Sequence, residues 1–171
     1  MIQFDINTVS SYYHGYIKLV NTLDFVNALE KSNQEMVSLI RSLPEEKGEY
    51  RYQPEKWSIK ESLCHIMDVE RVFAYRALRF GRNDQTLLHG FEDEDYAVEA
   101  NAHARTLNQL AQEMDHLRAS TLDLFKSFTS VMLQRKGMAS NNEFSVISLG
   151  YIIAGHERHH YKILTERYLT K

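Results

Sequence analysis

Near its C-terminal end the chain reads Gly155-His156-Glu157-Arg158-His159-His160-Tyr161. This stretch lies within a longer apolar pattern, residues 145–169, that predicts one continuous helix. Residues four apart on a helix project from the same side, so His156 and His160 point in the same direction. Apolar residues precede and follow the pair, which places both imidazoles within an apolar stripe. Buried imidazoles need hydrogen-bond partners or a shared cation, and one metal ion can accept a nitrogen from each at this spacing.

Three further amphipathic patterns precede this helix, and we expect helices at residues 21–42, 58–80 and 107–128. The first begins at Asn21 or Thr22, since both are good N-cap residues. The second has the clearest start, because Ser58 and Glu61 have the spacing of a capping box. The chain has only two prolines and seven glycines, which favours long helices over a turn-rich β fold. Four long amphipathic helices predict an all-α four-helix bundle, with residues 1–171 as a single domain.

Long connections join the predicted helices, at residues 43–57, 82–100 and 129–144. The second of these is long for a loop in a compact domain, so we expect it to be functional or partly helical. Its acidic run, residues 92–95, is interpreted as solvated. The third is polar and contains Gly137 and Asn141 as breakers of regular structure. Residues 1–20 are rich in aromatic side chains, and we expect an ordered lead-in or short helix that lays these rings on the bundle.

The composition narrows the class of protein. Hydrophobic residues make up 43% of the chain and charged residues 25%, as in an ordinary soluble globular protein. The net charge of -3 gives no general attraction to nucleic acid, so we expect no nucleic-acid partner. No segment approaches the roughly 20 apolar residues that span a bilayer, and the first residues lack the features of a signal peptide. The single cysteine, Cys64, excludes an intramolecular disulfide and fits a reducing compartment, so we expect a cytoplasmic protein without a membrane partner.

His65 is the histidine outside the last helix that lies within an apolar helical run. If the second and fourth helices pack side by side, His65 can meet His156 and His160. Three neutral imidazoles would hold a divalent ion and leave positions open for water or substrate, as in catalytic sites. Imidazole does not discriminate sharply among zinc, nickel, iron and manganese, so the identity of the metal stays open.

Other interpretations of these residues also remain open. A lone buried histidine such as His65 is often a hydrogen-bonded core residue, and His159 could replace His160 geometrically, although it lies nearer the rim. We expect Cys64 in the core. The remaining histidines have polar or unperiodic surroundings and are interpreted as surface residues: His14, His89, His103 and His116.

The stretch from His156 also satisfies the short H-E-x-x-H pattern of zinc peptidases, in which the glutamate is the general base. A zinc peptidase needs a third ligand beyond the motif, and only eleven residues follow His160. Glu166 has the spacing of such a ligand, but Ile163 replaces the glycine that would turn the chain back. On an unbroken helix, Glu166 lies about 240° around the axis from His160 and faces away. A peptidase is therefore disfavoured.

Two segments of the chain carry a family resemblance. Residues 57–71 resemble the DinB/YfiT-like family in their tryptophan-serine start, their histidine and the Glu-Arg pair that follows. Residues 155–160 resemble the C-terminal metal motif of the same family, and the resemblance extends over residues 23–169. It implies a four-helix bundle with long crossover connections in which His65, His156 and His160 bind a divalent cation, commonly nickel or zinc. It also implies a metal-dependent hydrolase or thiol S-transferase, a low-molecular-weight thiol co-substrate, and a homodimer.

These observations lead to two functional hypotheses. The first is an enzyme acting on a small molecule, which either delivers a metal-bound thiolate to an electrophile or hydrolyses its substrate with a metal-activated water. Glu70 or Glu157 would serve as proton acceptor or would orient a ligand, unless both are surface acids paired with basic neighbours. Several tyrosines are candidates to line the pocket, although core packing explains them equally well: Tyr12, Tyr13, Tyr16, Tyr50 and Tyr52. The second hypothesis is a non-catalytic metal-binding or stress-response module whose site is closed by a fourth protein ligand or by packing.

Overall fold

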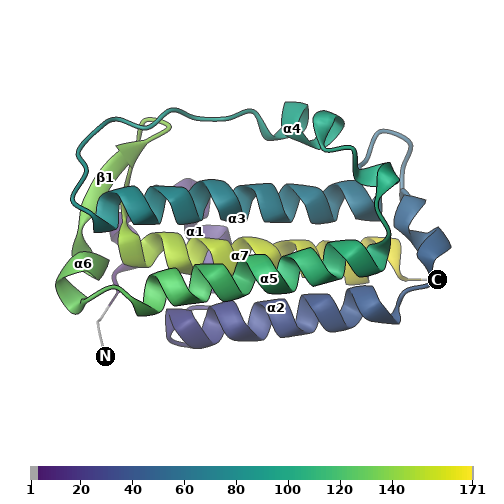
Figure 1. Ribbon diagram of the computed structural model, residues 1–171, viewed down its shortest axis with the longest axis horizontal. Helices are drawn as coiled ribbons and strands as arrows, with labels where there is room; N and C mark the ends of the chain where they lie inside the picture. The colour runs from purple at the N-terminus through teal and green to yellow at the C-terminus, as the bar shows by residue number, and fades with distance from the viewer. Residues whose placement is uncertain (1–3, 171) are drawn as a thin grey trace.

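The four long helices expected from the apolar patterns are present in the computed structural model, which describes residues 4–170 (Figure 1). They are α2 (Phe25–Ser42), α3 (Ile59–Gly81), α5 (Leu107–Lys126) and α7 (Val146–Ile163). α2 packs against α5 and α7, and α3 packs against the same two helices. The helices therefore form a closed bundle in the order α2, α5, α3, α7, and the predicted four-helix fold is confirmed.

Local sequence signals account for some helix starts better than for others. α3 begins as predicted, because Ser58 Oγ accepts from the Glu61 amide at 3.2 Å and the Glu61 carboxylate accepts from the Ser58 amide at 2.6 Å. α2 begins later than predicted, because Asp24 is the residue whose side chain accepts from two amides of the first turn. Asn21 and Thr22 precede that cap, so their assignment as N-cap was wrong.

The end of the last helix differs from an ideal α-helix. Ser145 caps α7, with its hydroxyl accepting from the Ser148 amide at 3.2 Å. The α-helical ladder ends at Ile163, and Leu164–Tyr168 continue as one π-helical segment. The predicted continuous helix is therefore present, with a wider last turn that buries Tyr168.

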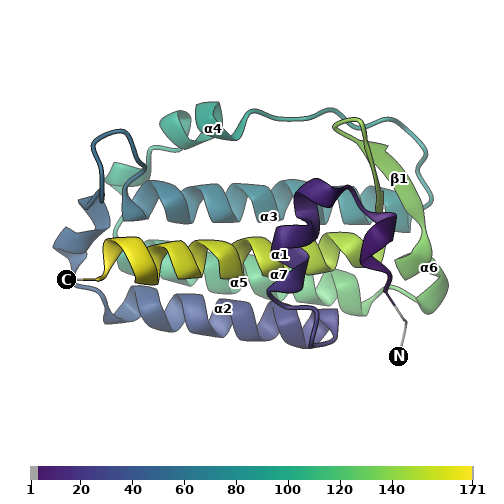
Figure 2. The same cartoon turned by 180° about the vertical axis from the view of Figure 1, so that it is seen from behind.

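The N-terminal segment crosses the bundle as the expected aromatic lead-in. It contains two 3₁₀ turns, Ile6–Thr8 and Ser11–Tyr13, followed by the short helix α1 (His14–Lys18). α1 packs on α7 and lies across it in Figure 2. Gly155 permits this close approach, because a Cβ atom at that position would clash with the backbone carbonyl of Tyr16.

The two longer connections contain regular structure of their own. The segment that follows α3 runs back along the bundle and contains α4 (Asp93–Glu99) and the 3₁₀ turn Ala102–Ala104 (Figure 1). The expectation of a long, partly helical crossover is therefore confirmed.

The segment after α5 contains α6 (Ser130–Gln134) and a β-hairpin of β1 (Lys136–Ala139) and β2 (Asn142–Ser145). The strands pair antiparallel with Ala139 opposite Asn142, and the turn between them has positive φ at Ser140 (48°) and Asn141 (60°). The prediction of an irregular polar connection was therefore wrong.

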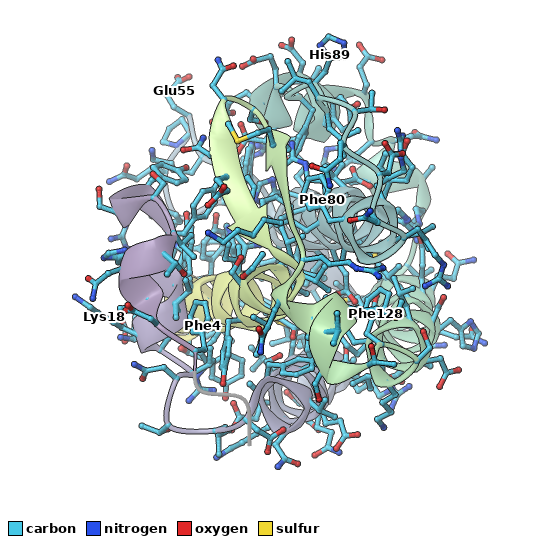
Figure 3. The ribbon with its side chains drawn as sticks, turned by 90° about the vertical axis from the view of Figure 1, so that its left-hand side faces the viewer. Phe4, Lys18, Glu55, Phe80, His89 and Phe128 are labelled. Carbon is cyan, nitrogen blue, oxygen red and sulfur yellow. The ribbon has the colours of Figure 1, made fainter. Side chains whose placement is uncertain are left out.

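The hairpin covers one end of the bundle, the end that faces the viewer in Figure 3. Leu88 joins it to the crossover, donating to Met138 O at 3.0 Å and accepting from the Ser140 amide at 3.1 Å. Gly137 lies so close to Phe80 of α3 that a side chain there would clash with the ring. Within residues 4–170, no helix is both long and apolar enough to cross a membrane.

Candidate metal centre

Two neighbouring helices bring three imidazoles together. His65 comes from the middle of α3, and His156 and His160 come from successive turns of α7. His156 Nε2 lies 3.1 Å from His65 Nε2 and 3.1 Å from His160 Nε2, and one ligand atom from each ring lies within 4.8 Å of the others. His65 and His156 are 4% and 7% exposed, and His160 is half-buried. The juxtaposition inferred from helical spacing is therefore present in the fold.

The donor set fits a divalent cation. Two nitrogens bound at about 2.05 Å to a tetrahedral ion lie about 3.3 Å apart, close to the two separations of 3.1 Å found here. Among residues 4–170, no carbonyl or carboxylate accepts a hydrogen bond from these three Nε2 atoms, whereas a shared cation would satisfy all three. An imidazole set of this kind suits zinc, nickel or iron.

Burial keeps the three imidazoles neutral, which is the form that binds a metal. It lowers the pKa of His65 to about 4 and that of His160 to about 3. It lowers the pKa of His156 well below its usual value, and the two neighbouring imidazoles lower it further. At neutral pH the nitrogen lone pairs are therefore available without the release of protons.

The other histidines lie outside this cluster. His159 is half-buried on the next face of α7, with its ring edge against Tyr16 at a centroid distance of 5.2 Å. His89, His103 and His116 are exposed, as predicted, whereas His14 is half-buried beside the carbonyl of Val9. Cys64 is buried in the core, as expected, and burial raises the pKa of its thiol.

A cavity of about 480 Å³ opens beside the three imidazoles. Trp57 packs over His65 with ring centroids 4.6 Å apart, and Tyr16 packs against His156 at 5.5 Å. In the described part of the chain, no fourth histidine, cysteine or carboxylate joins this group. The site is therefore neither closed by a further protein ligand nor filled by packing.

The tyrosines named from the sequence divide into two groups. Tyr12, Tyr13 and Tyr16 line the cavity from the N-terminal segment. Tyr50 and Tyr52 instead pack against Tyr168, with ring centroids 6.2 and 4.7 Å from it. Neither residue of the second group lines the cavity, and Tyr50 is 41% exposed.

Sequence reasoning missed two charged residues that line the cavity, Asp93 and Arg76. Asp93 belongs to the acidic run that was interpreted as solvated. It is exposed, but it lies close enough for its charge to oppose, weakly, the effect of burial on the pKa of His65. Arg76 follows His65 by eleven residues, which is a rotation of about 20° on a helix, so the two share one face. That spacing is the signal that could have identified it.

The two glutamates proposed as proton acceptors lie in the interior, outside the cavity lining. Glu70 is 3% exposed and Glu157 is 0% exposed, so the interpretation as surface acids was wrong. Both pair with Arg118, which donates to the two oxygens of Glu70 at 2.9 and 2.8 Å. Burial raises the pKa of Glu157, although Arg118 opposes the shift. Their location favours a role in holding α3, α5 and α7 together over a role in proton transfer.

Comparisons with known proteins support the fold. A family model of the DinB superfamily matches residues 28–164. The chain is similar in structure to YfiT from Bacillus subtilis, described as a probable metal-dependent hydrolase with an unusual four-helix bundle topology. That likeness has a TM-score of 0.74 at 12% sequence identity and covers 83% of this chain and 82% of the other, so it supports the fold. No curated protein matches the sequence significantly.

Proposed function

Because the chain belongs to the DinB superfamily, we propose that it is a divalent-metal-dependent enzyme acting on a small molecule in the cavity beside His65, His156 and His160. The observation that carries the proposal is the convergence of three neutral imidazoles, two buried and one half-buried, at the wall of an open cavity. The cavity, at about 480 Å³, is within the usual range of roughly 300–1,000 Å³ for small-molecule sites.

The chemistry follows from the donor set. A divalent ion held by three neutral ligands keeps its full charge, so it would act as a Lewis acid and lower the pKa of a bound water or thiol. Hydrolysis is the first candidate reaction, since the structurally similar YfiT is described as a probable metal-dependent hydrolase. Thiol transfer is the second candidate, because an all-imidazole site without an anionic ligand favours an incoming thiolate.

Residues around the imidazoles have separate roles in this proposal. Trp57 and Tyr16 restrict the orientation of the His65 and His156 rings and exclude water from one side of them. Burial raises the pKa of Tyr16 to about 12, so its hydroxyl stays protonated and acts as a hydrogen-bond donor to the substrate. The Asp93 carboxylate accepts the proton released by the attacking water or thiol.

Metal content tests the proposal directly. Elemental mass spectrometry of the untagged protein is expected to find one divalent ion per chain, which His65→Ala and His156→Ala each abolish. His159→Ala and His116→Ala are matched controls and are expected to retain the ion, since neither residue belongs to the cluster. Wild-type protein that takes up neither zinc nor nickel at neutral pH would contradict the enzyme proposal and favour the non-catalytic module. Zinc and nickel uptake also decides which metal to use in screens for hydrolysis and thiol transfer.

A further inference from the structure

Arg76 is a buried cation without an anionic partner. Its side chain is 2% exposed, and no carboxylate in residues 4–170 forms an ion pair with it. The other fully buried arginine, Arg118, is surrounded by Glu70 and Glu157. A guanidinium removed from water without a counter-charge destabilises the fold. Its location at the wall of a cavity therefore indicates that an anionic ligand binds there.

The surroundings of Arg76 fix its position and leave part of it free. Nη2 donates to Ser140 Oγ at 2.8 Å and to the carbonyl of His89 at 3.2 Å, which ties the guanidinium to the hairpin and the crossover. Its Cζ lies 4.8 Å from the centre of the Phe73 ring and 6.0 Å from that of Phe91. Nε and Nη1 donate no hydrogen bond to any described residue, so three N–H donors remain for a bound molecule.

Arg76 and His65 line the same cavity from different positions along α3, and His156 and His160 line it from α7. Arg76 follows His65 by eleven residues, so their Cα atoms are about 16 Å apart along the helix axis and nearly aligned around it. Val69 and Phe73 lie between them and form an apolar floor. The charge of Asp93 acts on His65 and Tyr16, which places Asp93 near the imidazoles.

We propose that Arg76 binds an oxyanion, a carboxylate or a phosphate, at one end of an elongated substrate whose reacting group lies beside His65, His156 and His160. This inference rests on the proposed function for the position of the reacting group, but the anion site belongs to the chain alone. The planar guanidinium supplies charge-assisted hydrogen bonds of a kind that suits a carboxylate or a phosphate. The intervening apolar floor would contact an uncharged linking segment of the substrate.

The single tryptophan of the chain, Trp57, lines this cavity and reports on its occupancy. We would titrate metal-free and zinc-loaded protein with hexanoate, hexanamide and hexyl phosphate, following Trp57 fluorescence. A hydrogen bond to a charged group contributes about 1.5–3 kcal/mol, so we expect an anionic ligand to bind at least about ten-fold more tightly than hexanamide. The metal-free titration is decisive, because a carboxylate could also bind zinc.

Variants of Arg76 assign the preference to this residue. Arg76→Gln is expected to reduce the advantage of the anion over hexanamide to less than about two-fold, and Arg76→Lys to retain part of it. Ser140→Ala removes one hydrogen bond to the guanidinium and keeps its charge, so this control is expected to retain the preference. If Arg76→Gln fails to fold by circular dichroism, the wild-type preference and its partial retention in Arg76→Lys decide the question.

The outcomes separate this inference from the proposed function. Tighter binding of hexanoate assigns a carboxylate, and tighter binding of hexyl phosphate assigns a phosphate. Equal affinities for hexanamide and both anions in metal-free wild-type protein, or a preference unchanged in Arg76→Gln, would overturn the inference even if zinc binds. A preference that persists in protein unable to take up zinc would support the anion site while contradicting the metal-dependent function.

Discussion

Nη1 of Arg118 on α5 lies 2.9 Å from Oε2 of Glu157 on α7, next in sequence to the candidate ligand His156. The same guanidinium binds both carboxylate oxygens of Glu70 on α3. Three helices of the bundle therefore share one buried ionic cluster. On α7 this cluster is adjacent in sequence to the candidate metal site. None of its three residues lines the cavity.

Removing the cation should destabilise the fold strongly. Arg118→Met leaves Glu70 and Glu157 buried without a counter-charge, so we expect the free energy of unfolding to fall by about 3–5 kcal/mol, measured by urea denaturation. The exposed pair of Arg41 with Asp115 provides a control, since Arg41→Met is expected to cost less than about 1 kcal/mol. Replacing both glutamates by glutamine in the Arg118→Met background should recover much of the loss. A loss below about 1 kcal/mol in Arg118→Met alone would disprove the role assigned to the cluster.

Gly155 should prove necessary for the packing of α1 on α7. In Gly155→Ala the new methyl group would clash with the backbone carbonyl of Tyr16, so α1 must move away from His156. We expect a loss of about 1–3 kcal/mol in the free energy of unfolding, as for other overpacked sites. Gly15→Ala in α1 is the matched control, because a Cβ there meets nothing within 4 Å and alanine favours the helix. Equal effects of the two substitutions would show that the close approach is not required.

The features that were predicted best from the sequence are those that depend on residues close together along the chain. The start of α3 was predictable because Ser58 and Glu61 satisfy each other within one turn. The start of α2 was misplaced because several good N-cap residues follow one another, and only the folded chain shows that Asp24 caps the helix. The hairpin was missed because its strands are only four residues long and one of them pairs with Leu88, far away in the sequence.

The same distinction holds for the site. His156 and His160 could be paired from helical spacing, and His65 followed once α3 and α7 were assumed to be neighbours. Arg76 could have been predicted from the sequence as a site residue, since it shares a face of α3 with His65. Asp93 could not have been predicted, because its position at the cavity depends on the path of the crossover and not on any local sequence pattern. The metal-ligand role of the histidines and the homodimer stay predictions, to be tested by metal analysis and by size-exclusion chromatography with light scattering.

The stability of the metal-free protein should depend on pH through the buried imidazoles. Their pKa values are lower in the folded protein, about 4 for His65 and about 3 for His160, than the usual 6.5, so the unfolded chain binds more protons between these limits. The contribution of these imidazoles to the free energy of unfolding is therefore fully present above pH 6.5. It is lost as the pH falls toward 4, by up to about 1.4 kcal/mol per pH unit for each histidine.

Urea denaturation at several pH values would check this dependence. His65→Asn is expected to have a shallower decline between pH 6 and pH 4.5 than the wild type, by up to about 1.4 kcal/mol per pH unit. Carboxylates elsewhere contribute equally to both proteins, so the difference in slope reports on His65. An equal or steeper decline in the variant would show that His65 is not held neutral in the fold.

Asp93 should affect catalysis without affecting the metal. It lines the cavity, and its charge acts on His65, but it does not belong to the cluster of three histidines. If it accepts the proton of the attacking water or thiol, Asp93→Asn should lower kcat about 100-fold or more at neutral pH. Metal content should stay at the wild-type level. Glu94→Gln is the matched control, because Glu94 is the next residue of α4, is exposed and does not line the cavity. Loss of the ion in Asp93→Asn would instead make Asp93 part of the metal site, and an unchanged kcat with the ion retained would exclude it as the proton acceptor.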